Sequence, residues 1–447
     1  MQITPTIRTE IQDYLEQHKM NMSQFAAKSG LNAGTVSGIV MSNRTISVHQ
    51  LDCVTQAMEK PEDYYYTRYV QEYMLEASLD WRRVKAFLQR CTELDRLDCI
   101  AQVVSVLMDN AAYYVPLVFE LAEEFFEQKL YKAAEILYEN VASGERNQHS
   151  ERLALSQYRL FTIRIGDDQS LNLRVATLFE PYVERLDEID QLDALKDLAN
   201  VYRSLHEWDK VNVTAIKLNR LAEIQYALEI ITKEPLRPLF FYVAYSNLLM
   251  GGFYHDQGNY EMALEKANQY ADLSWVRQTD ADTLHWKALF AEWAKANILL
   301  ARLMSGETQL LSDYVEFIET KEIEVTRGLW NIMIVANRFK VDVDRIINKY
   351  EQEISSLLKQ DKNEIYNQQN TDDQHIGLLY ELAHYSLLKE KYEEGYLHLF
   401  KGLEKSTIIN NDNSTLRFMR LFEHFRKYAS EEAKVEYHNL VRMEAII

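Results

Sequence analysis

The sequence predicts an all-α protein, and three observations support that fold class. Glycine and proline are scarce, with 13 and 6 residues in a chain of 447, so few of the turns that β-hairpins need are available. Apolar residues make up 47% of the chain, and they recur at helical spacing. No stretch rich in serine, glycine or proline separates globular domains. An all-β fold and a disordered chain are therefore excluded, and we expect one long array of helices.

Charge and cysteine content restrict the class of protein further. The net charge is −19, from 49 basic and 68 acidic residues. Cys53, Cys91 and Cys99 form no CxxC pair, so neither a disulfide framework nor a zinc site is expected. No stretch approaches the ~18 uninterrupted apolar residues of a membrane helix, and the first residues form an acidic amphipathic segment rather than a signal sequence. We expect a cytoplasmic protein that does not bind membranes.

The first element is a group of four or five short helices between residues 7 and 58. Within it, Ser23 is expected to cap a helix over residues 24–29, because serine side chains accept hydrogen bonds from free N–H groups at helix starts. Gly30 supplies the left-handed backbone of a tight turn. Asn32 is expected to cap the next helix, over residues 33–40. The pattern predicts two short helices joined by a tight turn.

This segment resembles the DNA-binding domains of the phage-repressor-like (XRE) helix-turn-helix family. The resemblance rests on the run from Ser23 to Asn32 and on Thr35-Val36-Ser37-Gly38-Ile39. It implies that residues 1–62 form a DNA-binding domain whose second short helix enters the major groove of double-stranded operator DNA. The implied DNA contacts are Asn32, Thr35 and Ser37 with base edges, and Gln24, Asn43 and Arg44 with phosphates or neighbouring bases.

The charge of this segment favours a second interpretation. Residues 1–66 contain five basic and seven acidic side chains, so counterion release contributes little to DNA affinity. Dimerisation of two such domains would offset this weakness. The alternative is a helical protein-interaction module that does not contact DNA.

Residues 63–110 are predicted to be connecting helices. They open with an aromatic group that is expected either to pack the small domain onto the rest of the chain or to pack against a second copy of the protein, with a plain packing role favoured. Its members are Tyr64, Tyr65, Tyr66, Tyr69, Tyr73 and Trp81.

The remaining residues, 111–447, contain a faint internal repeat. A small residue on one helix is followed at similar spacing by aromatic and small residues on the next, with Ala122, Ala199, Gly251 and Ala383 at equivalent positions. The spacing predicts helical hairpins, and it resembles the tetratricopeptide repeat. That resemblance implies a right-handed α-solenoid of degenerate hairpins that binds a peptide and dimerises.

In such a solenoid the first helix of each hairpin lines the concave face. Asparagine there can donate to and accept from a peptide backbone, which suits an extended ligand. The candidate peptide-binding residues are Asn200, Arg203, Tyr245, His255, Asn297, Asn331, Tyr380 and His384. Most other aromatic residues at helical spacing are expected to be core between hairpins.

No signature of metal, nucleotide or acyl-transfer chemistry occurs in the chain. We therefore expect neither an enzyme nor a cofactor. The combination of the two parts resembles the RRNPP group of peptide-pheromone receptors, which includes the PlcR, NprR, Rgg and arbitrium-receptor families. It implies a homodimeric, quorum-sensing transcriptional regulator whose DNA binding is controlled by a short signalling peptide. The alternative is a scaffold that binds proteins rather than DNA, or a repeat protein that binds a response regulator.

Overall fold

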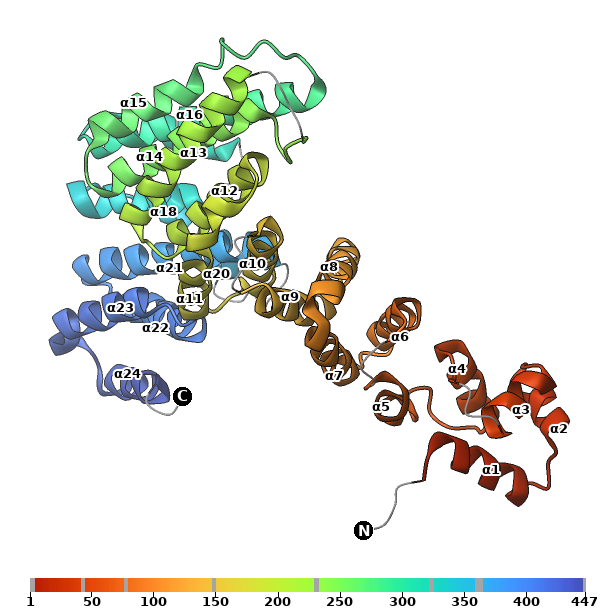
Figure 1. The fold of residues 1–447 in the computed structure, drawn as a ribbon. Coiled ribbons are helices and arrows are strands. Elements are labelled where there is room, and N and C mark those ends of the chain that lie inside the picture. The colour runs from red at the N-terminus through yellow and green to blue at the C-terminus, as the bar shows by residue number, and fades with distance from the viewer. Residues whose placement is uncertain are drawn as a thin grey trace. The chain divides into compact units, whose positions relative to one another are not determined.

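A computed structural model describes residues 5–41, 45–75, 79–146, 150–228, 233–320, 325–357 and 365–444. Every regular element within these ranges is a helix (Figure 1), which confirms the all-α class. None of these helices is both long and apolar enough to cross a membrane. The chain forms two compact units, Met1–Ile163 and Arg164–Ile447. The boundaries expected after residues 62 and 110 both lie inside the first unit.

The first unit begins with four helices of 8 to 11 residues, followed by the four-residue helix α5 (Tyr66–Tyr69) and by helices of 11 to 17 residues. A π-helical turn, Val70–Met74, follows α5, and the last helix crosses the boundary between the units. The helices are α1 (Ile7–Gln17), α2 (Met22–Ser29), α3 (Ala33–Met41), α4 (Val48–Ala57), α5 (Tyr66–Tyr69), α6 (Trp81–Glu93), α7 (Leu97–Leu107), α8 (Ala111–Glu127), α9 (Tyr131–Gly144) and α10 (Glu151–Arg164).

Helix α2 begins at a cap other than the expected one. Its N-cap is Asn21, whose side chain accepts a hydrogen bond from the Gln24 backbone N–H, while the Gln24 side chain accepts one from the Asn21 N–H, both at 2.9 Å. The prediction that Ser23 is the cap is wrong, because this reciprocal pair starts the helix one residue before the serine. The Asn32 cap of α3 is confirmed: its Oδ1 accepts from the Thr35 N–H at 2.7 Å.

Gly30 ends α2 in the left-handed conformation, with φ +68°. No atom lies within 4 Å of the position that a Cβ would take there. We expect Gly30→Ala to lower the free energy of unfolding by about 1 kcal/mol, through backbone strain alone. Urea denaturation would measure this loss. Gly166→Ala is the matched control, because Gly166 also has open space around it but no positive φ; an equal loss there would contradict the explanation.

The aromatic group after Pro61 packs the first four helices onto the helices that follow. Tyr65, Tyr66 and Tyr69 are fully buried. The Tyr66 hydroxyl donates to the Asp52 carboxylate at 2.8 Å, and the Tyr69 hydroxyl donates to the Ile46 carbonyl at 2.6 Å. The rings of Tyr66 and Tyr69 also lie against Phe87 of α6. The packing role expected for these aromatics is confirmed.

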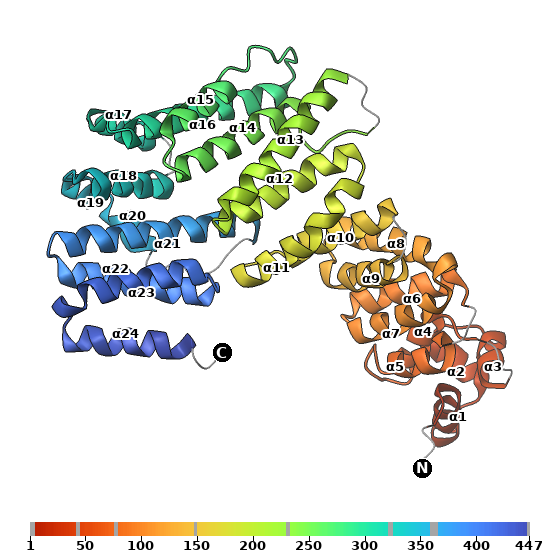
Figure 2. The same cartoon turned by 60° about the vertical axis from the view of Figure 1, so that its left-hand side comes forward.

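The second unit consists of α11 to α24, and its described residues also include short 3-10 turns between some of these helices. Figure 2 shows α21 to α24 as successive layers of the unit. The helices are α11 (Gln169–Phe179), α12 (Glu188–Ser204), α13 (Trp208–Leu228), α14 (Leu239–Asp256), α15 (Tyr260–Ala271), α16 (Ala281–Met304), α17 (Leu311–Glu319), α18 (Val325–Phe339), α19 (Asp344–Lys349), α20 (Glu351–Leu357), α21 (Ile365–Leu388), α22 (Tyr392–Ile408), α23 (Asp412–Phe425) and α24 (Glu431–Glu444).

The helix pairs expected from the repeat are neighbours in the structure. Helix α8 packs on α9, α12 on α13, α14 on α15, and α21 on α22. Ala122, Ala199 and Ala383 are fully buried. A Cβ on Gly251 would lie 3.4 Å from the Cβ of Lys266 in α15. Gly251 therefore lies where α14 approaches α15, and the three alanines at the equivalent positions are buried.

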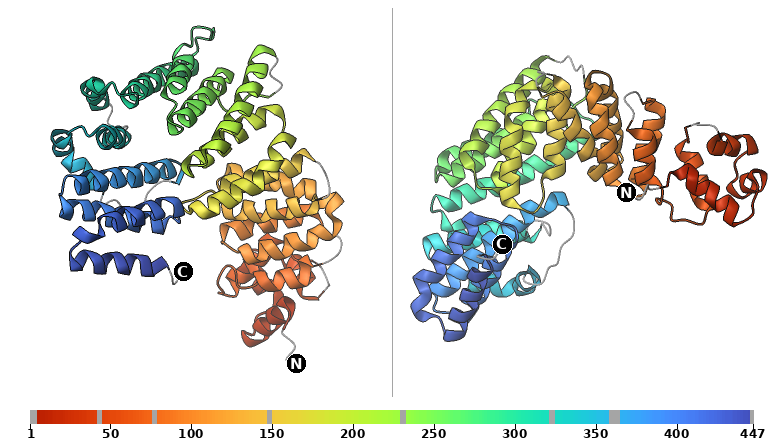
Figure 3. Two further views of the ribbon diagram at one scale, coloured as in Figure 1. Left: turned by 90° about the vertical axis from the view of Figure 1, so that its left-hand side faces the viewer. Right: turned by 60° about the horizontal axis from the view of Figure 1, so that its bottom comes forward.

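The helices of the second unit curve until early and late ones meet (Figure 3). The Gln169 N–H donates to the Ile409 carbonyl at 2.8 Å, and the Asn410 side chain donates to Asp168 at 2.9 Å. Helix α12 also contacts α21. These contacts join the start of α11 to the end of α22, and they close the array around an interior cavity.

Candidate functional site

The interior cavity of the second unit has a volume of about 360 Å³, within the range of roughly 300–1,000 Å³ that is usual for ligand pockets. Alternate helices of the array contribute most of its lining. Arg203 comes from α12; Leu249, Gly252 and His255 from α14; Asn297 and Leu300 from α16; Arg327, Trp330 and Asn331 from α18; and Glu381 from α21. The cavity is partly open, and side chains from these helices converge on it.

Four of the eight candidate peptide-binding residues line this cavity, namely Arg203, His255, Asn297 and Asn331. The other four are not among its lining residues. Asn200 and Tyr245 bond to each other, with the Tyr245 hydroxyl donating to Asn200 Oδ1 at 2.6 Å. The ring of Tyr380 lies 4.1 Å from the guanidinium of Arg417, and His384 lies beside Tyr380.

The two cavity asparagines are held by tyrosines from neighbouring helices. Asn297 Nδ2 donates to the Tyr270 hydroxyl at 2.7 Å, and Asn331 Nδ2 donates to the Tyr314 hydroxyl at 2.8 Å. Each bond uses one N–H of the amide and fixes its orientation. A side-chain amide has two N–H donors and a carbonyl acceptor, so the geometry suits pairing with a peptide group.

Both signs of charge are present around the cavity. Arg203, Arg327 and Arg417 supply cations, while Asp256 and Glu381 supply carboxylates. Arg417 and Glu381 approach each other to 3.7 Å. Burial raises the pKa of Asp256 above its ordinary value. The cavity is therefore suited to a ligand that carries both donors and acceptors, rather than to a purely apolar one.

Two buried ring nitrogens on the lining have no hydrogen-bond partner, His255 Nε2 and Trp208 Nε1. Burial, with smaller contributions from the charges of Arg327 and Arg338, lowers the pKa of His255 to about 4. His255 is therefore neutral at pH 7. Because buried polar atoms are normally satisfied, these two nitrogens are free positions at which a ligand would gain hydrogen bonds.

His206 also lines the cavity, but its pKa is shifted in the opposite direction to that of His255. Its Nε2 lies 2.8 Å from the Asp373 carboxylate. Burial lowers the pKa of His206, but the hydrogen bond and charge of Asp373 outweigh burial and raise the pKa overall. The pair links the loop after α12 to α21, at the place where the array closes.

Sequence reasoning missed several lining residues, and one signal would have found some of them. Arg327, Trp330, Asn331 and Ile334 all line the cavity from α18, and their spacing of three and four places them on one helix face. Once Asn331 is assigned to the cavity, the residues three or four positions away on the same helix are expected to line it too. Arg417 has no comparable signal, because it comes from α23, outside the hairpin pattern.

Four of the six candidate DNA-contacting residues lie on α2, on α3 or at the N-cap of α3. Gln24 and Asn32 are exposed, and Thr35 and Ser37 are half-buried on α3. Helix α3 packs against α1 and α2. Asn43 and Arg44 lie outside the described residues.

Two basic side chains near these helices are already engaged in internal contacts. The Lys28 ammonium lies 2.9 Å from the Glu59 carboxylate and donates to the Tyr14 hydroxyl, also at 2.9 Å. Arg8 Nε donates to the Ile39 carbonyl at 2.8 Å. These contacts leave less positive charge for phosphates, in keeping with the acidic balance of the segment.

A scan against models of known protein families finds no match for the chain, and a search of curated proteins finds none either.

Proposed function

We propose that this protein is a homodimeric transcriptional regulator. In this proposal α2 and α3 form a helix-turn-helix that binds an operator in double-stranded DNA. The following helices form a right-handed α-solenoid of tetratricopeptide-like hairpins, and a short signalling peptide in its interior cavity controls DNA binding. The observation that carries the proposal is the convergence of Arg203, His255, Asn297 and Asn331, from four alternate helices, on one cavity.

The arrangement supports a physical mechanism for control. A peptide that bonds to α12, α14, α16 and α18 at once restrains their relative positions. The array is held closed by the bonds of Asp168 and Gln169 to Asn410 and Ile409. Small shifts at each helix pair therefore add up to a change at these closing contacts. In a dimer, such a change alters the spacing of the two DNA-binding domains, and half-site spacing decides operator affinity.

The test is a selection of source-genome fragments bound by the full-length protein, at low and moderate salt. It is run with and without candidate peptides encoded by neighbouring reading frames. We expect enrichment of one inverted repeat, with the amount bound changed by one peptide. Asn32→Asp should abolish that enrichment, because aspartate keeps the helix cap but places a negative charge opposite DNA. Urea denaturation should show an unchanged stability.

Asn259→Asp is the matched control. Asn259 caps α15 in the same way, accepting from the Met262 N–H at 3.1 Å, and it is exposed. This variant should retain fragment enrichment. If the wild type enriches no repeat with any peptide, or if Asn32→Asp enriches the same repeat as the wild type, the proposal fails.

A protein-binding scaffold is the second candidate function, and the internal pairing of Lys28 with Glu59 favours it. A cation held in that way contributes little to phosphate binding. The scaffold interpretation predicts no fragment enrichment at any salt concentration.

A further inference from the structure

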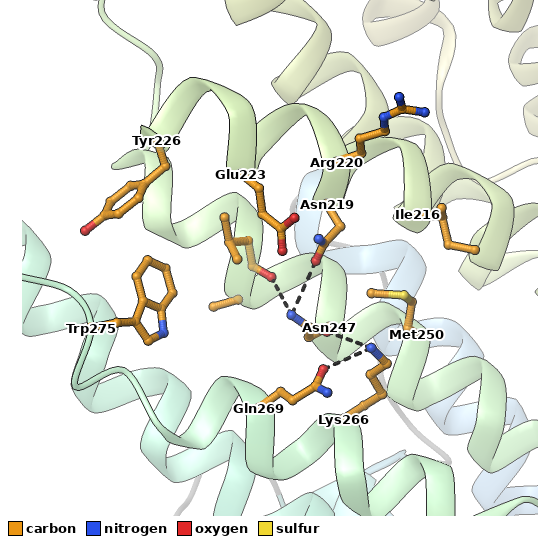
Figure 4. Close-up of a pocket in the computed structure, with 12 residues that line it drawn as sticks. Ile216, Asn219, Arg220, Glu223, Tyr226, Asn247, Met250, Lys266, Gln269 and Trp275 are labelled. Carbon is orange, nitrogen blue, oxygen red and sulfur yellow. Dashed lines mark hydrogen bonds between the residues drawn. The ribbon is translucent and has the colours of Figure 1, made fainter. Parts of the chain in front are cut away.

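A second depression, distinct from the interior cavity, lies on the second unit and has a volume of about 710 Å³. It is an open groove with walls from α13 and α15, a floor from α14, and Trp275 at one end (Figure 4). Helix α14 separates the two sites. Val243, Ala244 and Asn247 face the groove, whereas Leu249, Gly252 and His255 line the cavity.

Lys266 lies in this groove without a carboxylate partner. Its ammonium donates to Asn247 Oδ1 at 3.2 Å and to Gln269 Oε1 at 2.9 Å (Figure 4). No carboxylate of the described residues lies within ion-pair distance of it. An ammonium that is half-buried and held only by neutral amides gains most from a ligand carboxylate.

Arg220 and Glu223 lie in the same groove, on α13. Neither makes an ion pair within the described part of the chain, and the whole chain has 68 acidic and 49 basic residues. The groove therefore has two cations and one anion available to a ligand. This balance differs from the strongly negative charge of the whole chain and favours a ligand with a net negative charge.

The two ends of the groove are apolar. Tyr226 and Trp275 meet edge to face at one end, with ring centroids 5.0 Å apart. Ile216 and Met250 lie toward the other end (Figure 4). Trp275 is 38% exposed and Ile216 is 51% exposed. Large apolar side chains left open beside a polar groove mark binding surfaces.

We propose that this groove binds an extended polypeptide segment with an acidic side chain over Lys266 and an apolar side chain against Trp275. A polypeptide fits because the amides of Asn219, Asn247 and Gln269 follow the groove from α13 to α15, and side-chain amides pair with backbone N–H and carbonyl groups. An acidic side chain fits because it completes the coordination of Lys266. The site is independent of the peptide site proposed for the interior cavity.

Selection of a phage-displayed library of random heptapeptides on the full-length protein tests this inference. We expect enriched peptides to share an acidic residue beside an apolar one. Lys266→Gln should weaken their binding about tenfold or more, which corresponds to loss of one charge-assisted hydrogen bond. Replacing the acidic residue of the peptide by its amide should have a similar effect. Fluorescence polarisation of labelled peptides gives both affinities.

Two further variants keep the test decisive. Arg220→Glu reverses an exposed charge on the groove wall, so it should also weaken binding even if Lys266→Gln perturbs the fold. Lys401→Gln, at a half-buried lysine of α22, should leave binding unchanged. The inference is overturned if no peptide is enriched, or if Lys266→Gln and Arg220→Glu bind the enriched peptides as the wild type does. If the enriched peptides lose binding only in the Arg327→Glu variant, they bind the interior cavity, and this result also contradicts the proposed groove site.

Discussion

Lowering the pH from 7 to 5 is expected to destabilise the second unit by about 4 kcal/mol at two buried histidines, in addition to the loss at His255 of the interior cavity, whose pKa is also lowered to about 4. His375 and His398 are 4% and 6% exposed, and the Nδ1 atom of each has no hydrogen-bond partner. Burial lowers the pKa of both to about 4, and for His375 the charge of Lys405 adds to the effect. In the unfolded chain the ordinary pKa is about 6.5.

The sign of this pH effect follows from proton uptake by the unfolded chain. Below pH 6.5 the unfolded chain binds protons that the folded protein excludes, so stability is complete above pH 6.5 and is lost as the pH falls toward 4. At pH 5 each of these two histidines has lowered the free energy of unfolding by about 2 kcal/mol. His206 acts in the opposite sense, because its pKa is raised: its contribution is complete below pH 6.5 and is lost as the pH rises through the folded pKa.

Urea denaturation between pH 7 and pH 5 measures the slope of stability with pH, in a range where most carboxylates remain ionised. His398→Gln should remove about 2 kcal/mol of the loss. His424→Gln, at an exposed histidine of α23, should leave the slope unchanged. A slope that is the same in the wild type and in His398→Gln would contradict the assignment.

Gly377→Ala is expected to destabilise the protein by roughly 1–3 kcal/mol, the usual cost of overpacking a core. Gly377 of α21 lies directly against the indole of Trp330 in α18. A Cβ on Gly377 would lie 2.4 Å from that ring, so the indole has to move. Because Trp330 also lines the interior cavity, the variant should change ligand binding as well as stability.

A double mutant separates this steric effect from others. Trp330→Leu removes the ring, so adding Gly377→Ala to it should cost much less than in the wild type. Gly251→Ala is the control, because a Cβ there has its nearest contact at 3.4 Å and alanine favours a helix. Thermal and urea denaturation of the variants provide the comparison. Equal costs of Gly377→Ala with and without Trp330 would rule out the clash.

Local signals account for what the sequence predicted correctly. The small residues at Ala199 and Ala383 mark buried helix positions, and Gly30 and Asn32 mark a turn and a cap, all within a few residues of the feature they specify. The start of α2 was misplaced because Asn21 and Ser23 are both good caps, and only the partner at Gln24 decides between them.

The candidate site was only partly predictable for a different reason. Asn297 and Asn331 were predicted because their residue type suggests a ligand contact. Whether Tyr245 faces the cavity or bonds to Asn200 depends on how α12 and α14 pack. Arg417 reaches the cavity because the array closes on itself, and no local pattern encodes that closure.

The bond between Asp168 and Asn410 spans 242 residues of sequence, and this separation has a kinetic consequence. Neighbouring hairpins form through short-range contacts, which assemble quickly. The closing contact forms only when every intervening helix is in place. The entropic cost of bringing two chain segments together rises with their separation in sequence. Closure should therefore be a late step in folding, slower than the formation of the hairpins that precede it.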